Sequence, residues 1–193
     1  MESRTDTELM IAVCNGEVSL LADLFDRHHV RLFNFFLRLT DRRETSEDLV
    51  QEAFLRMLKY RKTYRAKASF PVWMYRIARN VLADHWGRAT RDEPLERAET
   101  VADPRISQFE AASLREEVAM LRAAMLSLPA ERRELLVLVR FEGLRHDEIA
   151  ALLDCSAGAV RVRAHRALAE LRDAYVALTG GQHDLRRAER TAD

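Results

Sequence analysis

The run YRKTYRAKASF, residues 60–70, interleaves aromatic side chains with lysine and arginine. Aromatic rings stack on nucleic-acid bases and cations follow the phosphates, which is the chemistry of single-strand binding. A loop between two helices can also supply a pocket for a base drawn out of a duplex. The run therefore predicts a site for single-stranded DNA. Its candidate contacts are Arg61, Lys62, Tyr64, Arg65 and Lys67.

The next segment, residues 69–88, predicts an amphipathic helix. Trp73 and Ile77 lie four positions apart, a spacing that favours packing into a core. The opposite side carries Arg76, Arg79, Asn80 and Asp84. Asparagine can read an adenine edge, so this side is a candidate surface for DNA. A buried helix with a solvated charged side would show the same pattern.

A second candidate DNA surface lies in residues 127–172, where three short helices predict a helix-turn-helix. Ser156 is suited to cap the third helix. Its expected core stripe is Val160, Ala164, Ala167, Leu168 and Leu171. Its opposite face holds Arg161, Val162, His165 and Arg166. Arginine can bond guanine edges and valine can pack on a thymine methyl, which favours reading of the major groove; a plain helical hairpin is the alternative.

Residues 47–59, EDLVQEAFLRMLK, predict another amphipathic helix, directly before the aromatic run. Its apolar arc is Leu49, Val50, Ala53, Phe54, Met57 and Leu58. Its other side holds Asp48, Gln51, Glu52, Leu55, Arg56 and Lys59. Acids that give way to bases along a helix suit its dipole, so an ordinary solvated face is again an alternative.

These segments belong to a chain that the sequence predicts to be all-α. Only six Gly and four Pro interrupt its 193 residues, and no stretch shows the alternation of a strand. We expect two small helical domains joined by a flexible linker that contains Pro94 and Pro104. The expected divisions are a first domain at 5–88, the linker at 89–107, a second domain at 108–176 and a polar, frayed tail at 177–193.

The charge of the chain is strongly uneven. Its formal net charge is zero, yet residues 56–91 hold ten bases and one acid. A basic block within a neutral chain is typical of a surface that binds a polyanion. A solvated basic face is the alternative.

Several kinds of function are disfavoured. Cys14 and Cys155 have no partner at metal-ligand spacing, so we expect no metal site, no cofactor and no disulfide framework. No glycine-rich phosphate loop or nucleophile elbow occurs, so no catalytic residue and no small-molecule substrate are predicted, and an enzyme is the weakest interpretation. No long apolar run suggests a signal peptide or a membrane span, and we expect a cytoplasmic protein.

Three motifs together resemble the extracytoplasmic-function (group 4) sigma factors of bacterial RNA polymerase. SEDLVQEAFLRMLK is similar to the polymerase-docking region 2.2, and FPVWMYRIARNVLADHWGR is similar to regions 2.3–2.4. LPAERRELLVLVRFEGLRHDEIAALLDCSAGAVRVRAHRALAELR is similar to regions 4.1–4.2. The motifs follow in the family's order and cover most of residues 20–172. The resemblance implies an alternative sigma factor that binds core RNA polymerase and directs it to promoters.

The resemblance also implies residue roles. Asp48, Gln51 and Glu52, with Leu55 and Arg56 on the same helix side, would dock to the polymerase. The loop at 61–69 and the side with Arg76, Arg79, Asn80 and Asp84 would read and open the −10 element. Arg161, Val162, His165 and Arg166 would face the −35 element, and Arg163 would contact phosphate. Nucleotidyl transfer would belong to the polymerase.

The family further implies an anti-sigma factor as partner, often membrane-bound, which would hold the cytoplasmic chain at the inner membrane. The sequence departs from the family pattern at three places: Asp154 for a common Gly, Ala159 for a common Thr and Arg145 for a usual Ser. Asp tolerates a left-handed backbone, so we expect the turn at Asp154 to survive. Two rival hypotheses are a stand-alone helix-turn-helix repressor, which leaves residues 47–70 without a role, and a helical adaptor for an acidic partner.

Overall fold

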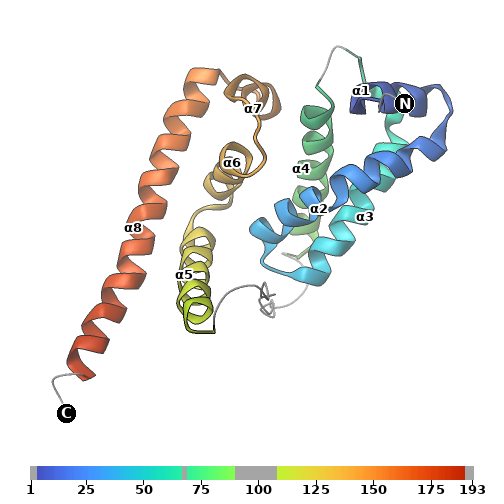
Figure 1. Ribbon diagram of the computed structural model, residues 1–193. Helices are drawn as coiled ribbons and strands as arrows, with labels where there is room; N and C mark the ends of the chain where they lie inside the picture. The colour runs from blue at the N-terminus through green and yellow to red at the C-terminus, as the bar shows by residue number, and fades with distance from the viewer. Residues whose placement is uncertain (1–3, 67–68, 90–107, 190–193) are drawn as a thin grey trace.

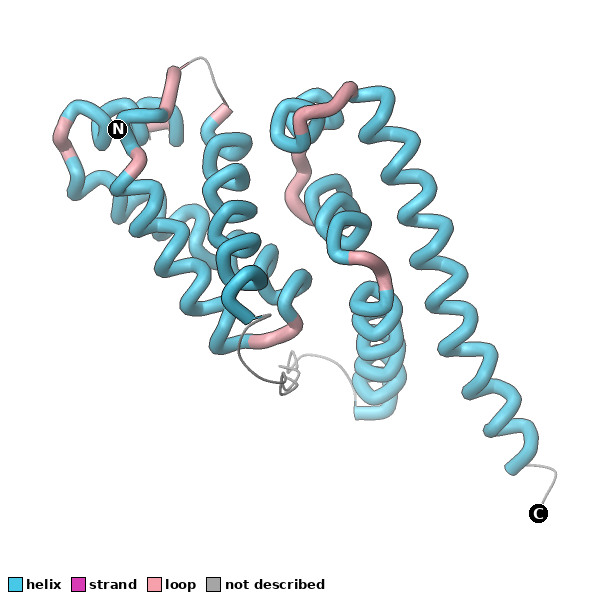
Figure 2. Tube along the Cα trace, turned by 180° about the vertical axis from the view of Figure 1, so that it is seen from behind, coloured by secondary structure: helices cyan, strands magenta, loops and turns pink. Residues whose placement is uncertain are grey.

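The computed structural model describes residues 4–66, 69–89 and 108–189, and within these ranges every regular element is a helix. The elements are α1 (Asp6–Asn15), η1 (Val18–Leu20), α2 (Leu21–Thr40), α3 (Arg43–Lys59), η2 (Arg61–Thr63), α4 (Phe70–Ala89), α5 (Gln108–Ser127), α6 (Ala130–Arg140), α7 (His146–Leu153) and α8 (Ala157–Glu189). The predicted all-α class is confirmed. Figure 1 shows α1–α4 gathered in one group and α5–α8 in a second, with α8 outermost, and the view from behind in Figure 2 agrees.

The first group is built around α2, whose apolar positions recur at helical spacing and face α3 and α4. Phe35 and Phe36 are fully buried, and Phe35 packs edge-on against Tyr75 of α4 with ring centroids 5.1 Å apart. Trp73 and Ile77 are buried on the same side of α4, as the sequence predicted. Burial of this aromatic layer fixes the direction of the polar side of α4, because the two sides of one helix cannot be rotated independently.

A polar clamp ties α1 to α2. The carboxylate of Asp6 accepts from Arg27 at 2.8 Å and lies 2.7 Å from Nε2 of the buried His28. Burial tends to raise the pKa of Asp6, but the hydrogen bonds and charges of Arg27 and His28 outweigh it and hold this pKa below its ordinary value. The clamp therefore stabilises the docked position of α1 with a charged carboxylate.

The second group contains the helix-turn-helix, formed by α7 and the first part of α8. The expected frayed tail is wrong as far as Glu189, since α8 continues through Gly180 and Gly181 as a single helix. Each glycine costs a helix about 1 kcal/mol, a cost that the helix-forming residues around them offset. The linker was expected at 89–107; Ala89 is the last residue of α4, and residues 90–107 lie outside the described residues. Along the described helices, none is both long and apolar enough to cross a membrane.

Candidate functional site

The turn between α7 and α8 sets the direction of α8, the third helix of the predicted helix-turn-helix. Asp154 ends α7 with a left-handed backbone, φ 50° and ψ 53°, so the expectation that Asp supports this turn is confirmed. The Ser156 hydroxyl accepts a hydrogen bond from the Ala159 amide at 3.1 Å, which is the predicted N-cap. Val160 and Ala167 are fully buried, but Leu168 is exposed, because it points away from the side that packs on the domain core.

The face of α8 opposite this core is open. Its exposed side chains are Arg161, Val162, Arg163, His165 and Arg166, the whole set assigned to the −35 element. None of its three arginines, Arg161, Arg163 and Arg166, has an ion pair with another residue that the structure describes. A cationic side chain without an internal carboxylate partner keeps its full charge for a phosphate or a base edge, so the face suits duplex DNA.

The aromatic-basic run is arranged differently from the prediction. Tyr64 is only 5% exposed and packs edge-on against Trp73, with centroids 5.3 Å apart, and Phe70 is also buried. We therefore remove Tyr64 from the base-stacking set, because a ring inside the core cannot stack on a base. Tyr60, which is 46% exposed, is the aromatic side chain that this run presents to solvent.

The bases of this run also differ in availability. Lys62 and Arg65 are exposed, whereas Arg61 is half-buried and donates to the Leu58 carbonyl at 2.9 Å. Lys67 lies outside the described residues. Lys62 and Arg65 beside Tyr60 form a small aromatic-basic surface, which is the combination that a melted strand requires.

Arg56 connects α3 to α4. Its guanidinium lies 2.5 Å from the Asp84 carboxylate and 2.6 Å from the Glu52 carboxylate. Both hydrogen bonds raise the pKa of Arg56 above its ordinary value, and the one to Asp84 has the larger effect. The geometry places Arg56 between two of the predicted site residues rather than pointing outward, so it can position Glu52 and Asp84 for their partners.

The outward face of α3 is partly apolar. Asp48 and Gln51 are exposed, and Leu55 is 62% exposed. Beside them is a hollow of about 370 Å³ between α2 and α3, lined by Phe25, His29, Val30, Phe33, Arg43, Glu47, Val50 and Gln51. The α2 part of this hollow was not predicted; the four-residue spacing of Phe25, His29 and Phe33 was its available signal. An exposed leucine beside an apolar hollow is typical of a surface that receives a partner helix.

Part of the polar side of α4 is exposed to solvent, and part of it contacts the second group of helices. Asn80 and Asp84 are exposed. Arg79, in contrast, donates to both Glu134 oxygens, at 2.6 and 3.3 Å, and to the Leu152 carbonyl at 3.1 Å. Arg76 donates to the Ala151 carbonyl at 2.9 Å. The two arginines of α4 that are assigned to the −10 element are thus bonded to α6 and α7.

The helix groups meet through a second polar contact that the sequence did not reveal. Glu142, between α6 and α7, is 1% exposed and accepts from the Tyr75 hydroxyl and from Arg31 Nε, the latter at 3.2 Å. Burial, and then the Glu142 charge, raise the pKa of Tyr75 above its ordinary value, because both favour the neutral phenol. Sequence separations of 67 and 111 residues leave no local pattern that could have paired these groups.

Comparison with known proteins gives two family matches. The family model for Sigma-70 region 2 matches residues 24–92, and that for Sigma-70, region 4, matches residues 119–171. The RNA polymerase sigma factor CarQ of Myxococcus xanthus is 32% identical over 161 residues, which cover 82% of this chain and 91% of CarQ. The ECF RNA polymerase sigma factor SigM of Mycobacterium tuberculosis H37Rv is 35% identical over 171 residues, covering 87% of this chain and 83% of SigM.

A further relative differs in length. The probable RNA polymerase sigma factor RfaY of Xanthomonas campestris is 40% identical over 134 residues, and the match spans 33% of its length. Among solved structures, CnrH in complex with the cytosolic domain of CnrY superimposes with a TM-score of 0.68 at 24% identity, covering 87% of this chain and 95% of CnrH. RpoE of Bartonella quintana, bound to the anti-sigma factor NepR, gives 0.67 at 19% identity, with coverages of 79% and 94%.

Proposed function

The chain belongs to the extracytoplasmic-function sigma factors of bacterial RNA polymerase. We propose which of its surfaces bind the polymerase and which bind promoter DNA. It is an alternative sigma factor, which binds core RNA polymerase and directs transcription initiation at promoters. Three surfaces carry this function: the outward face of α3, the Tyr60 loop (residues 60–66) with the polar side of α4, and the open face of α8. A stand-alone repressor would need only the open face of α8.

The outward face of α3 is the docking surface for the polymerase. The observation that carries this assignment is the exposure of Leu55, 62%, beside the hollow between α2 and α3. Leu55 supplies apolar contact area, while Asp48, Gln51 and Glu52 supply hydrogen bonds and fix the register of the partner helix. Arg56 forms an ion pair with Glu52 and so holds the Glu52 carboxylate in position.

The Tyr60 loop and α4 read and hold the melted −10 element. Tyr60 stacks on an extruded base, and the bases around it follow the phosphates. Asn80 and Asp84 are the base-edge readers of α4. The cations assigned to this strand are Arg61, Lys62, Arg65, Lys67, Arg76 and Arg79.

The open face of α8 reads the −35 element in the major groove. Arg161, His165 and Arg166 face base edges and Val162 packs on a thymine methyl. Arg163 contacts phosphate, which supplies affinity that depends on salt but carries no sequence information. Neither DNA surface needs to bind tightly alone, because docking to the polymerase makes both contacts intramolecular.

The chain supplies binding and orientation, and the polymerase performs the nucleotidyl transfer. We propose that it works in the cytoplasm and is restrained by an anti-sigma factor, which a membrane-bound partner could anchor at the inner membrane. The support is the similarity in fold to CnrH and RpoE, each of which was solved with a bound partner.

The docking assignment can be tested by titrating fluorescently labelled chain with core polymerase. Leu55→Arg and Gln51→Ala are expected to weaken binding by about tenfold or more, since both remove contacts at the centre of the surface. Glu44→Gln, an exposed change in the first turn of α3, is the matched control and should bind normally. Unchanged affinity in both variants would contradict the docking face. No polymerase binding by the unaltered chain, together with tight duplex binding, would favour the repressor.

A further inference from the structure

A cavity of about 540 Å³ lies where α4, α6, α7 and α8 meet. Figures 1 and 2 show α6 between α4 and α8, so the start of α6 lines the middle of the cavity and the other two helices line its sides. Four arginines face two glutamates in this lining, which leaves an excess of two positive charges. The arginines are Arg79 of α4, Arg132 of α6, and Arg163 and Arg166 of α8, and the glutamates are Glu131 and Glu134 of α6.

Two of these arginines, both on α8, have no carboxylate to bind. Arg163 and Arg166 lie three residues apart, so their side chains leave the helix on the same side. Both are exposed, and neither forms an ion pair with any residue in 4–66, 69–89 or 108–189. A planar guanidinium can bond two phosphate oxygens at once. The α8 side of the cavity therefore favours an anionic ligand.

The α4 side of the cavity holds an arginine in a fixed position. Arg79 donates to the Glu134 oxygens at 2.6 and 3.3 Å and to the Leu152 carbonyl at 3.1 Å, which uses three of its five N–H groups. The same bonds neutralise the Glu134 carboxylate, so it repels an incoming anion less. A guanidinium that is already held loses little further freedom when a ligand binds. The unpaired arginines of α8 thus face a fixed cation across the cavity.

The size and lining of the cavity narrow the class of ligand. Its volume lies within the range of small-molecule pockets, roughly 300–1,000 Å³, and excludes a DNA duplex from its interior. Its arginines come from three helices, so an anion with charge at several adjacent positions contacts more of them than a single phosphate does. Leu135 and Leu153 add an apolar part to the lining, which suits a planar base better than a further phosphate.

We propose that this cavity binds a small molecule with two or more adjacent phosphates, and that a nucleoside triphosphate fits it best. The phosphates bond Arg132, Arg163 and Arg166, and the base lies against Leu135 and Leu153. Arg163 and Arg166 are also assigned to the −35 element, so the ligand competes with duplex DNA for them. This competition rests on the proposed sigma-factor function, whereas the binding of the ligand does not.

Arg132 allows the ligand site to be tested apart from the DNA contacts. It lines the cavity from α6, is exposed and pairs with Glu170, and it carries no proposed contact to polymerase or promoter. Arg132→Met removes a cavity guanidinium at an exposed position, so the chain should fold normally. Arg172→Met is the matched control, because it removes an exposed arginine of α8 that pairs with Asp173 and does not line the cavity.

The experiment is equilibrium dialysis of the full chain against labelled ATP, pyrophosphate and inorganic phosphate, at fixed ionic strength and without divalent cations. Pyrophosphate should bind about tenfold more tightly than inorganic phosphate, because it reaches more than one guanidinium. ATP should bind more tightly still, because its base covers the two leucines. Arg132→Met should weaken the binding of ATP and pyrophosphate by about tenfold, and Arg172→Met should leave both unchanged.

The three probes also separate the possible sources of the phosphates. Equal affinity for ATP and pyrophosphate would support the site and assign it to a free polyphosphate instead of a nucleotide. Equal weakening by Arg132→Met and Arg172→Met would overturn the site, because a diffuse basic surface responds to both changes alike. Equal affinity for pyrophosphate and inorganic phosphate would overturn it as well.

Fluorescence anisotropy of a random-sequence duplex, without polymerase, tests the competition. Saturating pyrophosphate should release the duplex from the unaltered chain and should release less of it from Arg132→Met. Sodium chloride at the same ionic strength is the control for screening. Polyphosphate binding without release of the duplex would refute the competition alone. Failure of the unaltered chain to direct promoter-specific transcription would refute the sigma-factor role and leave the ligand site standing.

Discussion

Arg56 links α3, which carries the proposed docking surface, to α4, which carries proposed DNA contacts. Its guanidinium joins Glu52 of α3 to Asp84 of α4 through bonds of 2.6 and 2.5 Å. A planar guanidinium holds two carboxylates in fixed directions, which an ammonium on a flexible stem does not. The orientation of Glu52, a proposed docking side chain, is thereby linked to that of Asp84, a proposed DNA-reading side chain.

We expect Arg56→Met to lower the free energy of unfolding by about 1 kcal/mol or less, because Asp84 is half-exposed and its share of the bridge is screened. Transcription should fall further than this stability loss explains, and Arg56→Lys should restore it only in part. Urea denaturation and start-site-specific transcription measure the two effects. Arg43→Met, which removes an exposed pair with Glu47 on the same helix, should leave stability unchanged.

Tyr60 and Tyr64 give a matched pair for the stacking hypothesis. Tyr60→Ala should weaken binding of a single-stranded −10 strand by about tenfold, since stacking of one base contributes about 1–3 kcal/mol. Tyr60→Phe should bind normally because the ring is retained. Tyr64→Phe removes only a hydroxyl that donates to Thr7 at 3.3 Å, and should also bind normally. Equal affinity of Tyr60→Ala and the unaltered chain would exclude stacking on Tyr60.

Among the helices, α7 and α8 depend on the short turn between them. Its left-handed residue, Asp154, sets the direction in which α8 begins, and the face of α8 proposed to read the −35 element is exposed. We expect Asp154→Gly to keep or raise the unfolding temperature, because glycine adopts this backbone without strain. Asp154→Val should lower the free energy of unfolding by about 1–2 kcal/mol. Equal stability of the Val and Gly variants would show that the turn rearranges.

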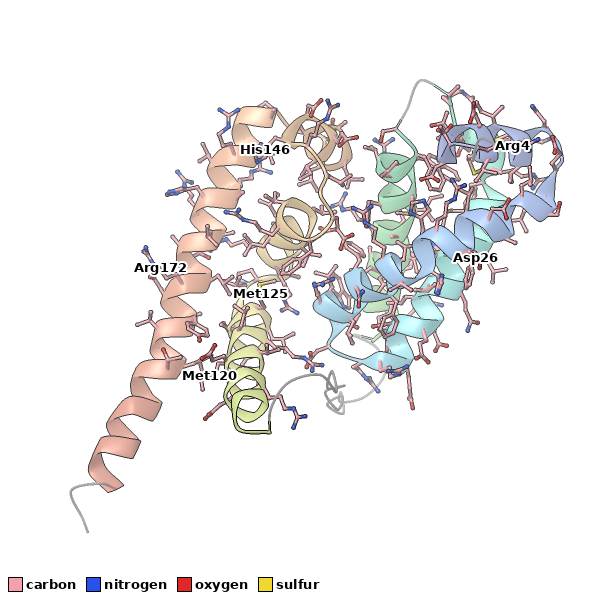
Figure 3. All side chains as sticks on the ribbon, viewed as in Figure 1. Arg4, Asp26, Met120, Met125, His146 and Arg172 are labelled. Carbon is pink, nitrogen blue, oxygen red and sulfur yellow. The ribbon has the colours of Figure 1, made fainter. Side chains whose placement is uncertain are left out.

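The clamp between α1 and α2 should make stability depend on pH. The pKa of Asp6 is lowered in the folded chain, so its contribution is present above the unfolded pKa near 4 and is lost as pH falls through the lower folded value. Asp6→Asn should therefore be less stable than the unaltered chain at pH 7, and the difference should shrink toward pH 3. Urea midpoints at both pH values measure it. Asp26→Asn, a labelled exposed position in Figure 3, is the control.

The sequence predicted those features that depend on residues close together in the chain, and it missed those that depend on residues far apart. Helical periodicity placed Trp73, Ile77 and Val160 in the core, and capping chemistry placed Ser156, because both depend on neighbours within one or two turns. Tyr64 was assigned to the surface because its neighbours in sequence are basic, whereas its burial comes from Trp73 and Phe70 after the chain turns back. Local composition cannot distinguish an aromatic ring that stacks on DNA from one that closes a loop.

In the molecule as a whole, the contacts hardest to predict join the two helix groups. The pairs Arg31–Glu142 and Arg79–Glu134 are 111 and 55 residues apart, and each consists of residues common on solvated helix faces. The family resemblance predicted which residues meet DNA, but not that Arg76 and Arg79 would bond to the second group. The helices follow from local patterns, whereas the packing of the two helix groups against each other involves charge pairs between residues far apart in sequence.

The most direct measurement of the central claim is in vitro transcription with core polymerase on fragments of the organism's own genome. We predict specific start sites that appear only when the chain is added, each preceded by two short elements near −10 and −35. These start sites should vanish with Leu55→Arg and persist with Glu44→Gln. A set of start sites that is identical with and without the chain, although the chain binds duplex DNA tightly on its own, would contradict the assignment as a sigma factor.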